Sequence, residues 1–146
     1  TQQVSSAASD VYKRQTQDCA IKWSVLISEN ENIEEINISF NAPKEFSEIS
    51  GICSHINLFS SKKISPESLM DLINKCDLLR KPERFYKASK ASSYLIESSL
   101  RPEKWIEIYD LLSDVSADKT LREGKLIAKK LNIDRLAALK NYLEKL

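Results

Sequence analysis

Five basic residues lie between positions 80 and 90, and Glu83 is the single acidic residue among them. The five are Arg80, Lys81, Arg84, Lys87 and Lys90. Their ammonium and guanidinium groups can neutralise phosphates, while Tyr86 and Tyr94 offer rings on which bases can stack. This combination is typical of an RNA-contacting surface. A solvated helix face with extended lysine and tyrosine side chains has the same composition, so both interpretations stay open.

A second basic segment follows Gly124. Residues 119–145 hold eight Lys or Arg and three acidic residues, whereas residues 29–48 hold six Glu and one Lys. A helix that begins at Gly124 would present free N–H groups and its positive dipole end, with Lys125 and Lys129 beside them and Arg135 further along. The formal net charge is only +1. The uneven distribution of charge, rather than its sum, is typical of a C-terminal half that faces a polyanion. Solvated helix faces give the same charge counts, so both interpretations stay open.

No group of residues predicts a reaction or a metal site. His55 is the one histidine, and its projection opposite Phe46 and beside Glu48 predicts an exposed side chain. Two glycines cannot build a glycine-rich phosphate loop, and no serine has a histidine partner or a glycine elbow. We therefore predict no catalytic residue, no metal ligand and no cofactor in this chain.

The three cysteines, Cys19, Cys53 and Cys76, are far apart and form no CxxC pair. This pattern supports neither a zinc site nor a disulfide framework. Cys53 and Cys76 lie on apolar helical stripes and are predicted to be buried thiols of a reducing cytosol. No apolar run approaches the roughly 20 residues of a membrane span, and no signal peptide is recognised. We expect a cytoplasmic protein without a membrane partner.

Residues that favour the beginnings and ends of helices predict an all-α array of about seven to nine short helices. A hydrophobic content of 42% with 29% charged residues is sufficient for a packed core. The alternating segment "INISF" at 36–40 resembles a strand, but a solitary strand has no pairing partner, so we predict helix there. The predicted helices span about 18–28, 32–40, 43 to beyond 56, 65–79, 82–98, 102–115, 116–123, 125–131 and 134–146.

Two helices have a predicted core face opposite their charged face. In the 82–98 helix the core face comprises Phe85, Ala88, Ser92, Leu95 and Ile96. In the last helix it comprises Leu136, Leu139, Leu143 and Leu146, with Arg135 and Tyr142 on the other side.

The chain is expected to have three segments. Residues 1–15 contain "SSAASDVYKRQ", which shows no periodicity and looks like translated adaptor sequence, so native sequence is expected to begin near Thr16. Residues 16–115 are predicted to form a helical body domain and residues 116–146 a helical tail.

Two blocks resemble the C-terminal region of bacterial CCA-adding enzymes, the tRNA nucleotidyltransferases. The first, "SPESLMDLINKCDLLRKPERF" at 65–85, contains the family's Asp, apolar pair and Arg-Lys-Pro-x-Arg: Asp77, Arg80, Lys81, Pro82 and Arg84. The second, "GKLIAKKLNIDRLAALKNY" at 124–142, resembles the closing element of the family. Its matching residues are Gly124, Lys125, Ile127, Leu131, Arg135, Ala137, Ala138 and Leu139.

The resemblance implies the tRNA-binding end of a longer enzyme. Family members add cytidine, cytidine and adenosine to tRNA 3′ ends from CTP and ATP, using Mg²⁺ and paired carboxylates in an N-terminal domain. Their helical body and tail hold the acceptor and TΨC region. The implied partners are tRNA, not DNA, and the chain's own missing catalytic domain. Departures from the pattern occur at Ser93 and Leu95, where the family has an acidic pair, and at Ile133 and Asp134, where arginines are frequent.

The predicted RNA-binding residues are Arg80, Lys81, Arg84, Lys87, Lys90, Lys125, Lys129 and Arg135. This hypothesis requires that they line one concave face and are not held in pairs with neighbouring acids. The alternative is a helical protein-interaction module that binds no RNA, in which the same residues scatter over several faces.

Overall fold

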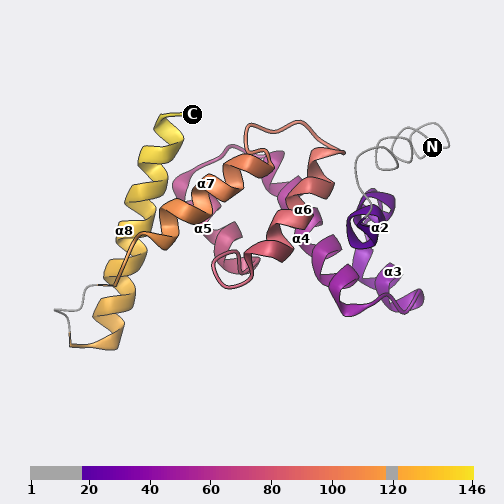
Figure 1. Cartoon of the computed structure of the whole chain (residues 1–146), viewed down its shortest axis with the longest axis horizontal. Coiled ribbons are helices and arrows are strands. Elements are labelled where there is room, and N and C mark those ends of the chain that lie inside the picture. Colours follow the sequence, from indigo (N-terminus) through magenta and orange to yellow (C-terminus); the bar gives the residue numbers. More distant parts are fainter. Residues whose placement is uncertain (1–17, 118–121) are drawn as a thin grey trace.

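The computed structural model describes residues 18–117 and 122–146, which form seven helices and no strand, so the predicted all-α class is confirmed. Short connections join the helices along the chain (Figure 1). The helices are α2 (Cys19–Ile27), α3 (Ile33–Ser39), α4 (Lys44–Ser60), α5 (Pro66–Lys75), α6 (Pro82–Ser93), α7 (Pro102–Ser113) and α8 (Gly124–Glu144). Among the described helices, none has both the length and the hydropathy that crossing a membrane requires.

Helix starts follow the predicted signals closely. The Ser65 hydroxyl accepts a hydrogen bond from the backbone N–H of Ser68, whose own hydroxyl accepts one from the N–H of Ser65, and Pro66 opens α5. Pro82 and Pro102 likewise occupy the first positions of α6 and α7, although no side chain caps these two helices. Proline suits the first turn because the N–H that it lacks has no partner inside the helix there.

The chain leaves α5 through Asp77, which takes the left-handed conformation with φ of 59°. The N–H of Leu78 donates to the carbonyl of Ile73, and the N–H of Asp77 donates to the carbonyl of Asn74. Glycine usually occupies this position, but aspartate tolerates it better than most residues. Asp77 can then use its carboxylate as well, which glycine could not do.

The core is centred on α4 and α6, which pack against each other and both contact α2. The ring of Phe85 on α6 meets the indole of Trp105 on α7 edge to face, with centroids 4.7 Å apart. Cys53 and Cys76 are buried as predicted. Other fully buried side chains of this core are Ile49, Leu69, Ile73, Ala88, Ile108 and Leu112.

The C-terminal helices predicted at 125–131 and 134–146 are one continuous helix, α8, so the predicted break was wrong. Residues 132 and 133 contain neither glycine nor proline, and nothing else in the sequence interrupts the helix. α8 lies at one end of the molecule, where it packs against α5 and α7 (Figure 1). Leu139 is fully buried, but Leu146 is 52% exposed, so the predicted buried stripe ends one turn earlier than expected.

Two further predictions were wrong, and two concern residues that lie wholly or partly outside the described part of the chain. α6 ends at Ser93 instead of 98, and Leu95 and Ile96 are half-buried in the connection that follows. His55 is half-buried instead of exposed; burial, with the nearby Lys75 charge, lowers its pKa below 6.5. The adaptor-like residues 1–15 and residues 118–121 of the predicted helix 116–123 fall outside the described residues, and the described residues of that segment are not helical.

Candidate nucleic-acid interface

Four of the predicted basic residues meet in an open groove of about 410 Å³ at the joint between α5 and α6. Arg80 and Lys81 reach it from the connection, and Arg84 and Lys87 from successive turns of α6. We call this surface the joint groove; its lining residues are Glu45, Arg80, Lys81, Pro82, Glu83, Arg84 and Lys87. Basic residues outnumber acidic ones in the lining by four to two, so its attraction for an anion depends on how many of the four are paired with acids.

The start of α6 contributes to the same positive field. Lys81 is the N-cap residue, and no side chain caps the helix. The first backbone N–H groups of a helix have no partner inside it, and the helix dipole concentrates positive charge there. Lys81 is exposed and forms no ion pair with any described residue. Lys81 and this helix start are therefore the parts of the groove most open to a phosphate.

Three of the four groove cations do have acidic partners, contrary to the expectation stated above. Arg80 binds the Asp77 carboxylate at 2.6 Å, and Arg84 binds Glu48 of α4 at 2.7 Å. The third, Lys87, is held by two acids, Asp18 and Glu45. Because Arg84 is only 19% exposed and joins two helices, its pair contributes to the fold as well as to the surface charge.

Lys87 connects three helices. Its ammonium lies 3.0 Å from the carboxylate of Asp18 and 3.0 Å from that of Glu45. Asp18 is also the N-cap of α2, where it accepts hydrogen bonds from the N–H groups of Ala20 and Ile21. Lys87 thus ties α6 to the first turns of α2 and α4. A phosphate that bound Lys87 would have to compete with both carboxylates.

These contacts move the protonation equilibria in the expected directions. Hydrogen bonds to Asp18 and Glu45 raise the pKa of Lys87 above 10.5. Burial acts to raise the pKa of Asp18, but Lys87 and the helix N–H groups outweigh it and lower that pKa below 3.8. The hydrogen bond from Arg84 lowers the pKa of Glu48 below 4.5. All of these groups are charged at neutral pH, so the network is intact there.

The Glu48–Arg84 pair predicts a pH dependence of stability. Because the pKa of Glu48 is lower in the folded chain than in the unfolded chain, the pair stabilises the fold above pH 4.5 and loses that contribution as the pH falls through the folded value. We expect the free energy of unfolding to fall less steeply for Glu48→Gln than for the parent between about pH 5 and pH 3. Urea titrations at several pH values across that range measure the free energy of unfolding of each variant. The exposed Glu31→Gln is the control, and equal slopes for both variants would refute the role of the pair.

Lys90 and Tyr94 lie outside the lining of the joint groove. Lys90 lies over the ring of Tyr86, with its nitrogen 5.1 Å from the centroid, in a cation–π arrangement. Tyr94 packs against the core instead of lying on the charged face, so its predicted position was wrong. α6 ends just before Tyr94, and the chain turns the ring inward there.

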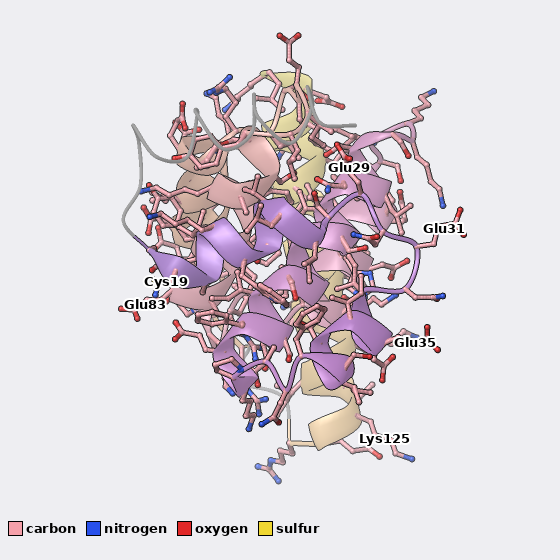
Figure 2. The ribbon with its side chains drawn as sticks, turned by 90° about the vertical axis from the view of Figure 1, so that its right-hand side faces the viewer. Cys19, Glu29, Glu31, Glu35, Glu83 and Lys125 are labelled. Carbon is pink, nitrogen blue, oxygen red and sulfur yellow. The ribbon has the colours of Figure 1, made fainter. Side chains whose placement is uncertain are left out.

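The basic residues of the second block lie on α8 and do not line the joint groove. Lys125 and Lys129 are exposed on the first turns of the helix, and Figure 2 shows Lys125 extending from one end of the molecule. Arg135 is half-buried, and its Nε is buried without a hydrogen-bond partner among the described residues. No described groove connects the two groups, so their binding to one RNA stays a prediction.

The first part of the acidic segment lies away from the joint groove, whereas Glu45 lines the groove and Glu48 binds Arg84. In Figure 2, Glu29, Glu31 and Glu35 lie along one edge of the molecule, and Glu83 lies at the opposite edge. Glu29, Glu31 and Glu35 therefore form an acidic surface that is distinct from the surface around Glu83. A polyanion approaching Glu83 and its neighbours would meet the basic side.

The described carboxylates can be compared with the requirements of a metal site. Within the described residues, no group of three or more His, Cys, Asp or Glu side chains could hold a metal ion. Glu45 of the groove lining binds Lys87, and the neighbouring Asp18 and Glu48 bind Lys87 and Arg84. The geometry of the groove suits anion contact.

The described residues thus form an all-α protein in which the joint groove brings four basic residues together. A CCA-adding enzyme of Pseudomonas entomophila (strain L48) is 32% identical to this chain over 75 residues. That match covers 49% of this chain and 20% of the relative, so the chain corresponds to about a fifth of the curated protein. No family model matches the sequence, and no solved structure matches it. The similarity suggests a relationship to the CCA-adding enzymes and covers too little of either chain to show membership.

Proposed function

We propose that this chain binds tRNA as part of a tRNA nucleotidyltransferase of the CCA-adding type. The similarity to the P. entomophila enzyme supports the choice of tRNA. The observation that carries the proposal within this chain is the joint groove, where four cations meet the uncapped start of α6. Together they form a positive surface on which a phosphate backbone can lie.

The four groove cations would differ in how readily they contact a phosphate of the tRNA. Lys81 and the α6 start can accept a phosphate without breaking any described ion pair. Arg80 has only a local carboxylate, Asp77, to exchange and is 77% exposed. Arg84 and Lys87 are paired with Glu48, Glu45 and Asp18, which offset their charge, so they would contact a phosphate only by exchanging these partners.

Nucleotide addition would belong to a domain outside this chain. We propose that such an N-terminal domain, with Mg²⁺ and CTP or ATP, adds nucleotides to the 3′ end while the helical region holds the tRNA. Lys125, Lys129 and Arg135 would contact a more distant part of the same tRNA, and a cytoplasmic location follows from this role. The body and tail boundary near residue 115 is part of the same proposal.

A protein-interaction role is the second candidate. Ile38 and Phe40 at the end of α3 are each 72% exposed, which is unusual for large apolar side chains outside an interface. The engagement of Arg84 and Lys87 with acids also suits a helical module that binds no RNA. RNA binding distinguishes the two candidates directly.

We expect the purified chain to bind a tRNA transcript with an affinity that falls steeply between about 50 and 200 mM salt, because bound cations release counterions from the phosphates. Fluorescence anisotropy at several salt concentrations gives the dissociation constant and its slope. A DNA duplex of equal length should bind more weakly, because the proposed recognition depends on RNA shape. No binding to tRNA at the lowest salt concentration would refute the proposed function and favour the interaction module.

A further inference from the structure

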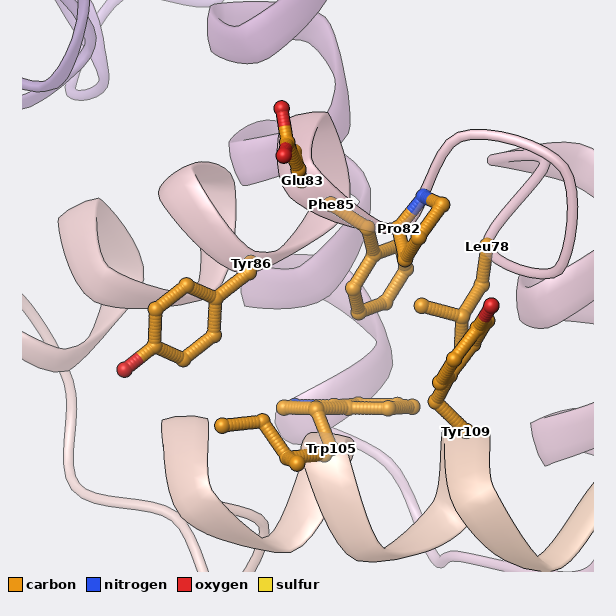
Figure 3. Close-up of a pocket in the computed structure, with 8 residues that line it drawn as sticks. Leu78, Pro82, Glu83, Phe85, Tyr86, Trp105 and Tyr109 are labelled. Carbon is orange, nitrogen blue, oxygen red and sulfur yellow. The ribbon is translucent and has the colours of Figure 1, made fainter.

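An aromatic pocket of about 200 Å³ lies between α6 and α7. In Figure 3 the indole of Trp105 lies beneath the ring of Phe85, with Tyr86 and Tyr109 at opposite ends of the pocket. Ile106, which is 45% exposed, forms part of its rim. The carboxylate of Glu83 points away from Trp105. The interior is therefore built from rings and aliphatic carbon.

The size of the pocket restricts its occupant. Sites for drug-sized ligands usually measure roughly 300 to 1,000 Å³, so about 200 Å³ suits one planar ring system or one apolar side chain. The indole Nε1 of Trp105 is buried and has no hydrogen-bond partner among the described residues. A buried donor without an acceptor costs free energy. The pocket does not expose this atom, so its lining offers an occupant apolar and aromatic surface and no hydrogen bond.

The pocket and the joint groove share a wall. Pro82 and Glu83, in the first turn of α6, line both of them. The basic residues lie on one side of this turn, and the aromatic residues lie on the other. An occupant of the pocket that also carries a phosphate could therefore place the phosphate among Arg80, Lys81 and the α6 start.

We propose that the aromatic pocket receives one unstacked base of the bound RNA, while a phosphate flanking that base lies in the joint groove. This inference rests on the proposed function, because it takes RNA as the ligand of the groove. Single-stranded and bulged nucleotides are commonly held by stacking on aromatic side chains beside a positive surface. Tyr86 is the principal stacking residue, since its ring is half-buried and Lys90 already lies against it.

The test compares two RNA hairpins that differ by a single base. One carries a bulged adenosine, and the other carries an abasic ribose at the same position, so their backbone charge is identical. We expect the parent chain to bind the adenosine hairpin at least about 5-fold more tightly, because one base–aromatic stack is typically worth this much or more. Anisotropy titrations in low salt give both dissociation constants.

The variants show whether the preference arises in the pocket. Tyr86→Ala should bind both hairpins equally, and Tyr94→Ala, at the end of the same helix and outside the pocket, should keep the parent preference. Ile106→Gln is a second rim variant that needs no change in α6, and it should reduce the preference too. Circular dichroism establishes that each variant is folded.

The outcomes separate the two proposals. If the parent binds both hairpins equally well, or if Tyr86→Ala and Ile106→Gln both keep the preference for the base, the pocket proposal is overturned while groove binding stands. If the parent binds neither hairpin, the proposed function fails, and the base site fails with it. A base preference that disappears in the pocket variants supports the inference.

Discussion

Replacing Phe85 with alanine is expected to lower the free energy of unfolding by about 3–5 kcal/mol, the usual cost of removing a large aromatic side chain from a core. Phe85 is fully buried and packs edge to face against Trp105 at 4.7 Å. It lies on α6, which packs against α2, α4 and α7, so a cavity at this point affects most of the described fold. A loss of this size is a large share of the 5–15 kcal/mol by which small domains are usually stable.

Urea denaturation followed by circular dichroism at 222 nm measures the change. Phe40→Ala is the matched control, because Phe40 is 72% exposed and has only an edge contact with Trp23. We expect the control to lose about 1 kcal/mol or less. If both substitutions had equal effects, Phe85 would not be the centre of this core.

Neutralising the two exposed cations of the joint should weaken tRNA binding. We expect the double variant Arg80→Gln, Lys81→Gln to bind tRNA about 10- to 30-fold more weakly near 50 mM salt. The slope of log affinity against log salt should become shallower by about 1.5, because two phosphate contacts are lost. Arg84 is left unchanged, since its pair with Glu48 links α6 to α4 and its removal could disturb the fold.

The control removes the same charge elsewhere. Lys62 and Lys63 are adjacent, exposed lysines in the connection between α4 and α5, outside the joint groove. Lys62→Gln, Lys63→Gln should change the affinity by no more than about 2-fold. Equal weakening by both double variants would mean that tRNA responds only to the net charge, and the joint groove would lose its assigned role.

Local signals in the sequence predicted most helix starts. Helices α5, α6 and α7 begin at Pro66, Pro82 and Pro102, and Ser65 caps the first of them. These starts were predictable because capping and proline geometry depend on neighbouring residues alone. Helix ends were harder to predict. α6 stops at Ser93 although apolar periodicity continues to Ile96, since the chain turns to reach α7.

Ion pairs between distant residues could not be predicted. Lys87 meets Asp18 and Glu45, and Arg84 meets Glu48, across separations of 36 to 69 residues, which no helical periodicity encodes. The buried polar chain from the Trp23 indole through the Asn37 side chain to the Ser50 hydroxyl was missed for the same reason. A cluster of cations was predictable from the sequence, but not the acids that hold it.

The double role of Asp18 limits how the protein can be shortened for experiments. Its carboxylate closes the first turn of α2 and also holds the Lys87 ammonium, so one side chain at the edge of the described region serves two helices. A recombinant version starting at Cys19 would fray at its N-terminus and leave Lys87 with Glu45 alone. A shortened protein should therefore retain Asp18. Without it, binding would be measured on a groove in which Lys87 has lost one of its two carboxylate partners.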